Sequence, residues 1–180
     1  MPNQNRVQTQ YVISGNPDTV NAASAYFDGQ IGQSIDVNDR EYQFVQLDSG
    51  ATASTATGVV AANQLAYWHD RSQYIVTNDS ANALLSQTAS SFRNNVAGVF
   101  RNAVTAGNYC FVLQQGRAIT VKEAGSATAG MLLVCDTSTT AAQTLGVAIN
   151  TAPPAQLLGV CRVATSGSTC TADLSIAGIP

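Results

Sequence analysis

The sequence predicts an all-β protein, a compact β-sandwich or barrel with an extended N-terminal segment and at most one short helix. Three observations lead to this fold class. Short apolar runs recur at intervals of about ten residues in the second half of the chain, as expected for short strands joined by turns. Glycine, asparagine and small polar residues separate the runs. Prolines fall only in connections or near the termini, as strands require.

The first expected strand covers residues 6–13, where Val7, Tyr11 and Ile13 share one face and alternate with polar residues. This alternation is typical of a half-buried strand. Turn-forming residues follow it at positions 14–18. Because the strand precedes the compact pattern, its apolar face is a candidate for contact with a partner. The alternative interpretation makes it the first strand of the same domain.

Residues 31–37 and 41–47 predict a pair of strands, with Asn38-Asp39-Arg40 as the hairpin connection. The apolar phase of the second strand changes between Phe44 and Val45, so apolar side chains lie on both of its faces. A β-bulge or burial on both faces would explain this change.

Residues 64–77 predict a second pair of strands, in which Asp70-Arg71-Ser72 turns one strand into the other. Residues 79–94 hold the only segment with a helical pattern. Asp79 or Ser80 would cap this helix, and alanine and leucine residues would fill its first turns.

The strand signal is clearest from residue 96 onward. The run from Tyr109 to Leu113 is continuously apolar, which predicts burial on both faces. Gly116 is expected to turn the chain back into a strand at residues 118–121. A glycine inside a strand usually marks a bulge or a close approach of two backbones. The other expected strands are 96–100, 131–135, 145–149 and 157–163, and three of these contain such a glycine, Gly98, Gly146 and Gly159.

The chain of 180 residues is long enough for one ordinary domain, or one domain with a long arm. The pattern divides it into residues 1–63, which hold N-terminal strands and a loop, and residues 64–180, the main β domain. The small residues at 48–58 predict a surface loop. The first part is therefore a candidate arm that contacts neighbouring molecules.

Charged residues make up only 11% of the chain, against about 25% in a typical soluble domain. Its polar surface must come from amides and hydroxyls, which are desolvated at lower cost than charges. Such a surface suits a chain that packs against other chains. The net charge is −3 and the arginines are scattered, so direct nucleic-acid binding is not expected.

Membrane insertion is not expected, because no stretch approaches the ~18 apolar residues of a spanning helix. The first residues lack the apolar core of a signal peptide, so export is not expected either. The cysteines match no zinc-binding pattern, and neither a metal nor a cofactor is expected. Three of them, Cys110, Cys135 and Cys161, are interpreted as small core residues in a reducing cytosol, whereas Cys170 is left open.

The sequence contains no catalytic motif, and we do not expect an enzyme. His69 beside Asp70 could form part of a catalytic triad, but neighbouring residues on a strand point to opposite faces. A histidine next to a turn is therefore the favoured interpretation. Tyr67 and Trp68 could form a stacking platform for sugars or bases, although such residues are more often core or interface anchors.

Several short segments carry a resemblance to a known family through their order and spacing. The segments are Tyr67-Trp68, 74–77, 96–99, 103–109 leading into 111–116, 129–132 and 145–148. In this order they resemble the capsid decoration (cement) proteins of tailed bacteriophages. The resemblance covers residues 67–163, about half of the chain, and leaves the N-terminal third unmatched.

The resemblance implies a structural virion protein on the outer surface of the phage head, made in the host cytoplasm before assembly. Its implied partners are the major capsid protein and further copies of itself, as a trimer. It would clamp neighbouring capsid proteins against the internal pressure of the DNA, through many modest contacts. The alternative function is a binding module of a fibre or a carbohydrate-binding type. The candidate residues for contact with the capsid or with another copy are Val7, Tyr11, Ile13, Tyr67 and Trp68.

Overall fold

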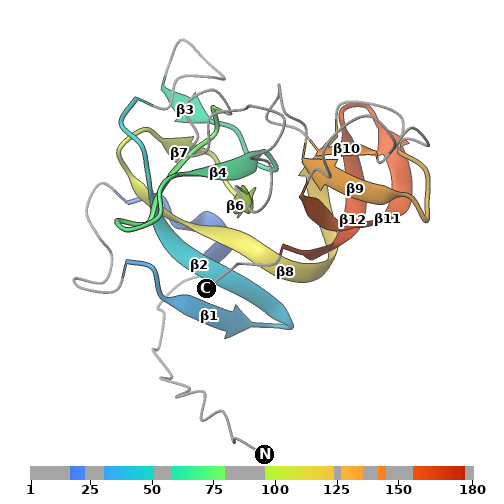
Figure 1. Ribbon diagram of the computed structural model, residues 1–180, viewed down its shortest axis with the longest axis horizontal. Coiled ribbons are helices and arrows are strands. Elements are labelled where there is room, and N and C mark those ends of the chain that lie inside the picture. Colours follow the sequence, from blue (N-terminus) through green and yellow to red (C-terminus); the bar gives the residue numbers. More distant parts are fainter. Residues whose placement is uncertain are drawn as a thin grey trace, which may run out of the picture.

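In the computed structural model, the described residues fold mainly into β-strands (Figure 1). The structure describes residues 17–22, 31–50, 58–79, 96–123, 127–135, 142–144 and 156–176. Within these ranges the only helical element is the short 3-10 turn η1 (Pro17–Thr19). The prediction of an all-β fold is therefore confirmed.

Some of the predicted elements lie outside the described residues. These include the first strand at residues 6–13, the strand at 145–149 and most of the loop at 48–58. The predicted helix at 79–94 also lies outside, except for its first residue, Asp79, which is not helical.

The strands of the described chain vary from two to fourteen residues in length. They are β1 (Ser34–Val37), β2 (Arg40–Leu47), β3 (Val59–Val60), β4 (Leu65–Asp70), β5 (Ile75–Thr77), β6 (Val96–Phe100), β7 (Val104–Thr105), β8 (Tyr109–Lys122), β9 (Leu132–Cys135), β10 (Ala142–Thr144), β11 (Leu157–Ser166) and β12 (Thr169–Ser175).

Five of these strands close into a barrel. Strand β2 pairs in parallel with β5, and β5, β4, β6 and β8 then pair in antiparallel fashion in that order. Strand β8 pairs back onto β2 and completes the ring. Because the ring is closed, each of the five strands has a hydrogen-bonded neighbour on both sides for at least part of its length. Strands β3 and β7 form a separate two-stranded ribbon.

Strand β8 is shared between the barrel and a second sheet. Residues 109–115 pair with β2, and residues 115–122 pair with β12. The second sheet then continues through β11, β9 and β10. In Figure 1, β8 runs in yellow from the barrel on the left to the orange and red sheet on the right.

The predicted turn at Gly116 is wrong, because β8 passes through this residue as one strand. The bend comes instead from a bulge, in which three steps along β8 from Gly116 to Ile119 face two steps on β12. Ala118 has a φ of 54° in this bulge. A Cβ at Gly116 would lie 3.1 Å from side-chain atoms of Arg40 and Ile119, so packing explains this glycine.

Both predicted hairpins are confirmed. Asn38 and Asp39 connect β1 to β2 with φ values of 52° and 60°. Positive φ at both central residues is typical of a two-residue type I′ turn, which matches the twist of the flanking strands. Strands β4 and β5 pair around the turn at residues 71–74.

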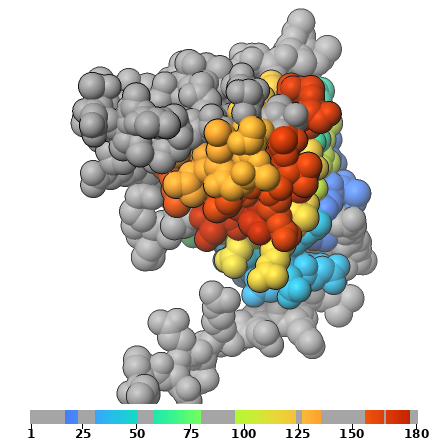
Figure 2. All heavy atoms as spheres, turned by 90° about the vertical axis from the view of Figure 1, so that its right-hand side faces the viewer, coloured from blue at the N-terminus to red at the C-terminus, as the bar shows by residue number. Residues whose placement is uncertain are grey.

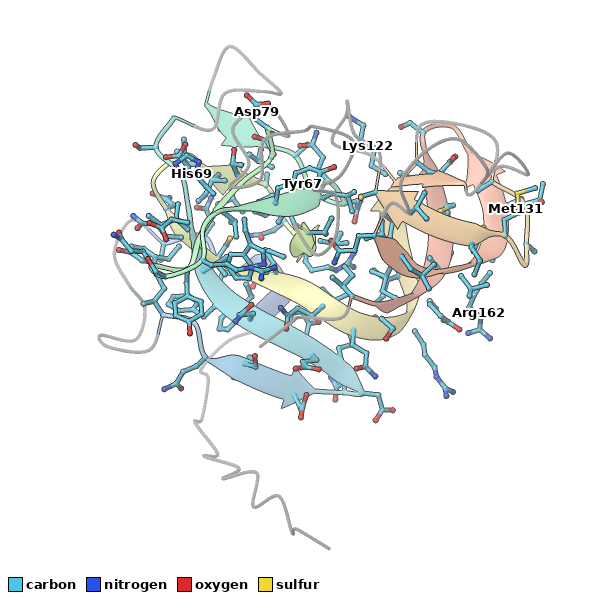
Figure 3. The ribbon with its side chains drawn as sticks, in the orientation of Figure 1. Tyr67, His69, Asp79, Lys122, Met131 and Arg162 are labelled. Carbon is cyan, nitrogen blue, oxygen red and sulfur yellow. The ribbon has the colours of Figure 1, made fainter. Side chains whose placement is uncertain are left out.

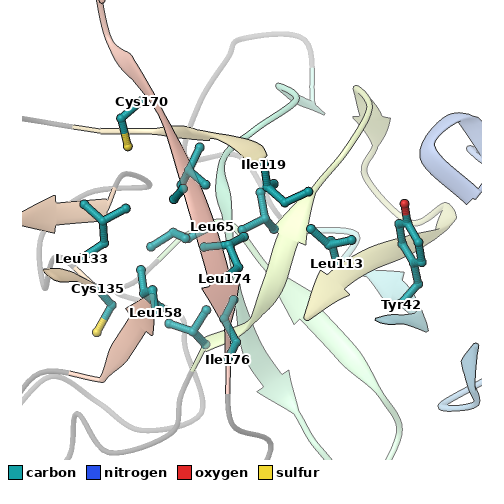
Figure 4. Close-up of a cluster of buried hydrophobic side chains, with 14 of the residues drawn as sticks. Tyr42, Leu65, Leu113, Ile119, Leu133, Cys135, Leu158, Cys170, Leu174 and Ile176 are labelled. Carbon is teal, nitrogen blue, oxygen red and sulfur yellow. The ribbon is translucent and has the colours of Figure 1, made fainter. Parts of the chain in front are cut away.

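Two hydrophobic cores lie on opposite sides of the barrel wall. The phase change in β2 separates them, because Phe44 belongs to one core and Val45 to the other. The interior core comprises Val45, Leu47, Val60, Ala66, Trp68, Val76, Ala97, Phe100, Val104, Cys110 and Val112. The outer core joins barrel residues such as Tyr42, Leu65 and Leu113 to Leu133, Leu158 and Leu174 of the second sheet (Figure 4).

The alternation of β8 explains its continuous apolar sequence. Cys110 and Val112 point into the barrel, whereas Phe111 and Leu113 belong to the outer core. All four side chains are buried. The prediction of burial on both faces is therefore confirmed for residues 110–113, while Tyr109 is partly buried.

The pairing also bears on the division of the chain at residue 63. Strand β2 lies before this position, yet it pairs with β5 and β8, which lie after it. Described residues on both sides of position 63 therefore contribute strands to the same barrel.

Gly98 and Gly159 lie where the backbone of another strand approaches closely, as predicted. A Cβ at Gly98 would lie 2.8 Å from the carbonyl oxygen of Leu113, and one at Gly159 would overlap the carbonyl oxygen of Asp173. Gly146 lies outside the described residues.

We expect Gly98→Ala to lower the free energy of unfolding by about 1–3 kcal/mol, because the added methyl group meets backbone atoms that cannot move aside. Gly50→Ala is the control, since its nearest neighbour is a carboxylate oxygen of Asp48 at 3.2 Å, on a side chain that can rotate away. We expect the control to change stability by less than about 0.5 kcal/mol. Urea unfolding followed by the fluorescence of Trp68 measures both, and equal losses would contradict the close approach of the strands.

Candidate functional site

A cluster of charged and polar side chains fixes the start of the described chain to the barrel. Asp18 in η1 lies 3.2 Å from Nη1 of Arg40 and 3.4 Å from Nε of Arg101. The hydroxyl of Tyr42 donates a hydrogen bond of 2.9 Å to the same carboxylate. Burial raises the pKa of Tyr42 above its ordinary value, so the hydroxyl remains a donor at neutral pH.

Amide side chains hold the residues that follow η1. Asn102 donates to the carbonyl of Val20 at 3.0 Å, and Asn21 donates to the carbonyl of Ala103 at 3.2 Å. Residues 17–22 are therefore anchored by both charges and hydrogen bonds. The three N-terminal candidate contact residues, Val7, Tyr11 and Ile13, precede this anchor and lie outside the described residues.

Tyr67 and Trp68 lie on β4 and point to opposite sides of the barrel wall. Tyr67 belongs to the outer core and is 3% exposed, while Trp68 belongs to the interior core and is 6% exposed. The Trp68 ring contacts Tyr74 edge-on, and the guanidinium of Arg71 lies 5.7 Å from its centroid. Such burial does not favour a stacking platform or a contact with another chain, and we assign both residues to the core.

His69 and Asp70 end β4, and the carboxylate of Asp70 serves the turn that follows. Its Oδ1 accepts hydrogen bonds from the hydroxyl of Ser72 at 2.7 Å and from the Ser72 amide at 2.8 Å. The hydroxyl bond is the main reason that the pKa of Asp70 lies below its ordinary value, and the backbone bonds and the nearby His69 add to the effect. These contacts support the interpretation of His69 as a residue beside a turn.

The most distinctive surface of the described chain is an apolar face on the second sheet. Large hydrophobic side chains that are 40–58% exposed gather on β9 and β11 and on the residue before β9. We call them the β9–β11 face. Its members are Met131, Leu132, Leu157, Val160 and Val163. Figure 2 turns this side toward the viewer, and the orange and red strands form its surface.

Two of the three bulges in β11 bring three of these side chains to the same face. Residues three apart on a regular strand point to opposite sides, yet Leu157, Val160 and Val163 are all exposed. Strand β11 has one extra residue against β9 after Leu157, and another against β12 after Cys161. Each extra residue shifts the phase by one position and aims the next apolar side chain outward.

A charged pair lies beside the face. Nε of Arg162 is 3.5 Å from Oδ2 of Asp173, and both side chains are about half exposed. Oδ1 of Asp173 also accepts a hydrogen bond from the backbone N–H of Ala118 at 3.0 Å. Figure 3 shows Arg162 and Met131 at the outer edge of the second sheet, far from Tyr67 and His69 on the barrel.

This face was not predicted from the sequence, because the run at residues 157–163 was interpreted only as a strand. The spacing of three between Leu157, Val160 and Val163 was the available signal, since it fits neither one face nor continuous burial. Strand β12 was missed as well, although Cys170, Ala172 and Leu174 alternate with more exposed residues.

All four cysteines are buried, and Cys170 joins Cys135 and Cys161 in the outer core. Burial raises the pKa of Cys110 and of Cys170 to about 12. Their thiols are therefore neutral at physiological pH, as expected for small core residues.

Among the described residues, no group of three or more histidine, cysteine or acidic side chains could hold a metal ion. No helix in this part of the chain is long and apolar enough to cross a membrane. The described residues thus belong to the all-β structural class, as a barrel joined to a second sheet with an exposed apolar face.

A scan against protein-family models and a search of curated proteins found no match to this chain.

The buried thiol of Cys110 predicts a loss of stability at high pH. Unfolded thiols ionise near pH 8.5, whereas Cys110 in the folded chain ionises at about pH 12. Between these values the unfolded state holds fewer protons, so the free energy of unfolding falls as pH rises. We expect Cys110→Ala to reduce the slope of this fall by up to about one proton per molecule.

Urea unfolding at a series of pH values between about 8 and 11 measures this slope. Val112→Ala is the control, because it removes side-chain volume from the same interior core and leaves the thiol in place. The control should lose stability at every pH and keep the slope of the original chain. An unchanged slope in Cys110→Ala would contradict the predicted role of this thiol.

Proposed function

We propose that this protein is a capsid decoration protein, which binds the outside of a phage head and clamps neighbouring major capsid proteins. The observation that carries the proposal is the exposed β9–β11 face on a body that has few charges. A contiguous cluster of exposed apolar side chains on a protein surface is often an interaction site. The segments at residues 67–163 that resemble decoration proteins support the same conclusion.

The composition fits a protein that acts by contact alone. Charges make up only 11% of the chain, so the cost of desolvating its surface against a shell is low. Each contact of modest size contributes little free energy, but contacts repeated over a symmetric shell raise the barrier to rupture. The proposed partners are the major capsid protein and further copies of the chain, as a trimer on the virion surface.

Three of the carboxylates have structural roles in the fold, which agrees with a function that involves no catalysis. Asp18 holds the start of the described chain, Asp70 holds a turn, and Asp173 holds the bulge of β8. Each of them has a structural function in the fold. The alternative of a carbohydrate-binding module is less well supported, since Tyr67 and Trp68, the aromatic residues proposed for it, are buried.

Phage heads that lack this protein should assemble but release their DNA at a lower temperature than decorated heads. The physical reason is the loss of contacts that bridge capsid proteins under internal pressure. Heating purified heads and recording DNA release with an intercalating dye measures the difference, and adding back the purified protein is the control. Bare heads that withstand heat as well as decorated ones would overturn the proposal.

We also propose that the N-terminal segment with Val7, Tyr11 and Ile13 acts as an arm that reaches a neighbour on the shell. The triple variant Val7→Ser, Tyr11→Ser, Ile13→Ser should then bind heads at least tenfold more weakly, because the apolar face of the segment is lost.

The matched control changes Gln4, Gln8 and Gln10 to serine, which alters the polar positions of the same segment. It should bind heads as the original chain does. Co-sedimentation with heads measures binding, and circular dichroism checks that the β structure is kept. Equal binding of the triple apolar variant and the control would remove the arm from the proposal.

A further inference from the structure

We infer that residues 6–13 of the free chain pair, as an additional strand, with the outer edge of β1 on the same molecule. The inference rests on the proposed function only in treating this segment as an arm. It goes further by naming the surface that holds the arm before any neighbour is present. The arm then has to leave this edge in order to reach another molecule.

Strand β1 ends the sheet and offers an edge to one more strand. It pairs with β2 on one side, and no other strand of the described chain pairs with it. Figure 1 shows β1 at the lower border of the ribbon, next to β2. A strand at the end of a sheet presents a row of backbone donors and acceptors, and an extended segment can bind there by adding a strand.

The register of the hairpin shows which backbone groups of β1 point outward. Val37 and Arg40 flank the two-residue turn, and in a hairpin of this type the flanking residues form a hydrogen-bonded pair. Such pairs alternate along an antiparallel ladder, so the backbone groups of Ile35 also face β2. Those of Ser34 and Asp36 therefore point away from β2, toward the position of an added strand.

The side chains of β1 leave an apolar flank that is only half covered. Ile35 and Val37 pack against the outer core but are partly buried, whereas Ser34 and Asp36 are exposed. A strand beside β1 would cover this flank if its own apolar side chains alternated with polar ones in the same way. Residues 6–13 have this alternation.

The anchor at η1 places the segment within reach of the edge of its own molecule. Asp18 contacts Arg40 of β2, whose partner in β1 is Val37. A strand added beyond β1 lies about 10 Å from β2, at two strand spacings. The chain from Ile13 to Pro17 spans up to ~13 Å when it is extended, so it covers this distance. A tethered segment also has a higher effective concentration at the edge than a segment of another molecule.

Charge favours the N-terminal segment as the occupant of this edge. Residues 34–41 contain three acidic residues and one basic residue, Arg40, which contacts Asp18. Residues 1–16 contain Arg6 and no acidic residue. Pairing therefore brings a positive charge to a negatively charged hairpin. Charged side chains on an edge strand discourage pairing with strands that do not match them.

Amide hydrogen exchange of the purified full-length protein, followed by NMR at single residues, tests the inference. The comparison is with the triple serine variant of the arm, which lacks the apolar side chains that would cover the flank. We expect the amides of Ser34 and Asp36 to exchange at least tenfold more slowly in the original chain than in this variant. The amides of Ile35 and Val37 face β2 and should exchange equally in both, which shows that the hairpin is folded.

The variant with Gln4, Gln8 and Gln10 changed to serine is the matched control. It alters the polar positions of the same segment and should keep the slow exchange of the original chain. Dilution of the original chain is the second control. Pairing within one molecule does not depend on protein concentration, so the exchange rates should stay the same.

Two outcomes would overturn the inference. One is equal exchange of Ser34 and Asp36 in the original chain and the triple serine variant, since the arm would then not cover the edge. The other is slow exchange that is lost on dilution, since the segment would then come from another molecule. Binding to phage heads tests the proposed arm separately. A triple serine variant that loses head binding without any change in exchange would contradict this inference alone.

Discussion

The fold depends on one long strand whose two halves serve two different sheets. The first half of β8 closes the barrel against β2, and the second half begins the sheet that continues through β12. This double use requires apolar side chains on both faces between Tyr109 and Leu113, since one set fills the barrel and the other packs toward the second sheet. It also requires a bend, which the bulge around Ala118 provides. The outer core therefore forms only when both sheets are in place.

Turns and apolar runs could be predicted from the sequence because their causes are local. Asn38 and Asp39 tolerate positive φ, and Asp70 can bind the backbone two residues ahead, so both hairpins follow from a few neighbouring residues. The glycine at position 116 was misinterpreted because its neighbours are Arg40 and Ile119, and only the folded sheet brings Arg40 there. A glycine kept for packing looks the same in a sequence as a glycine kept for a turn.

The candidate site could not be predicted for a related reason. Whether Val160 points inward or outward depends on the register of β11 against both β9 and β12, and both pairings contain bulges next to this residue. That register is a property of three strands together, and a further register shift against β12 follows Val163. In the opposite direction, Tyr67 and Trp68 were interpreted as core or interface anchors, because aromatic side chains are enriched at interfaces as well as in cores. Their neighbours on a barrel strand bury both rings, one on each side of the wall.

In the proposed role, the scarcity of charge and the apolar face act together. A neutral surface is desolvated at low cost, but it also provides little long-range attraction toward a partner. Encounters between free copies would then be neither steered nor strongly held. On a shell, a contact of low affinity would be sufficient, because neighbouring copies already lie within reach and each contact forms at a high effective concentration. A face of a few hundred Å² is well suited to this use, since a larger one would favour aggregation of the free protein before any shell exists.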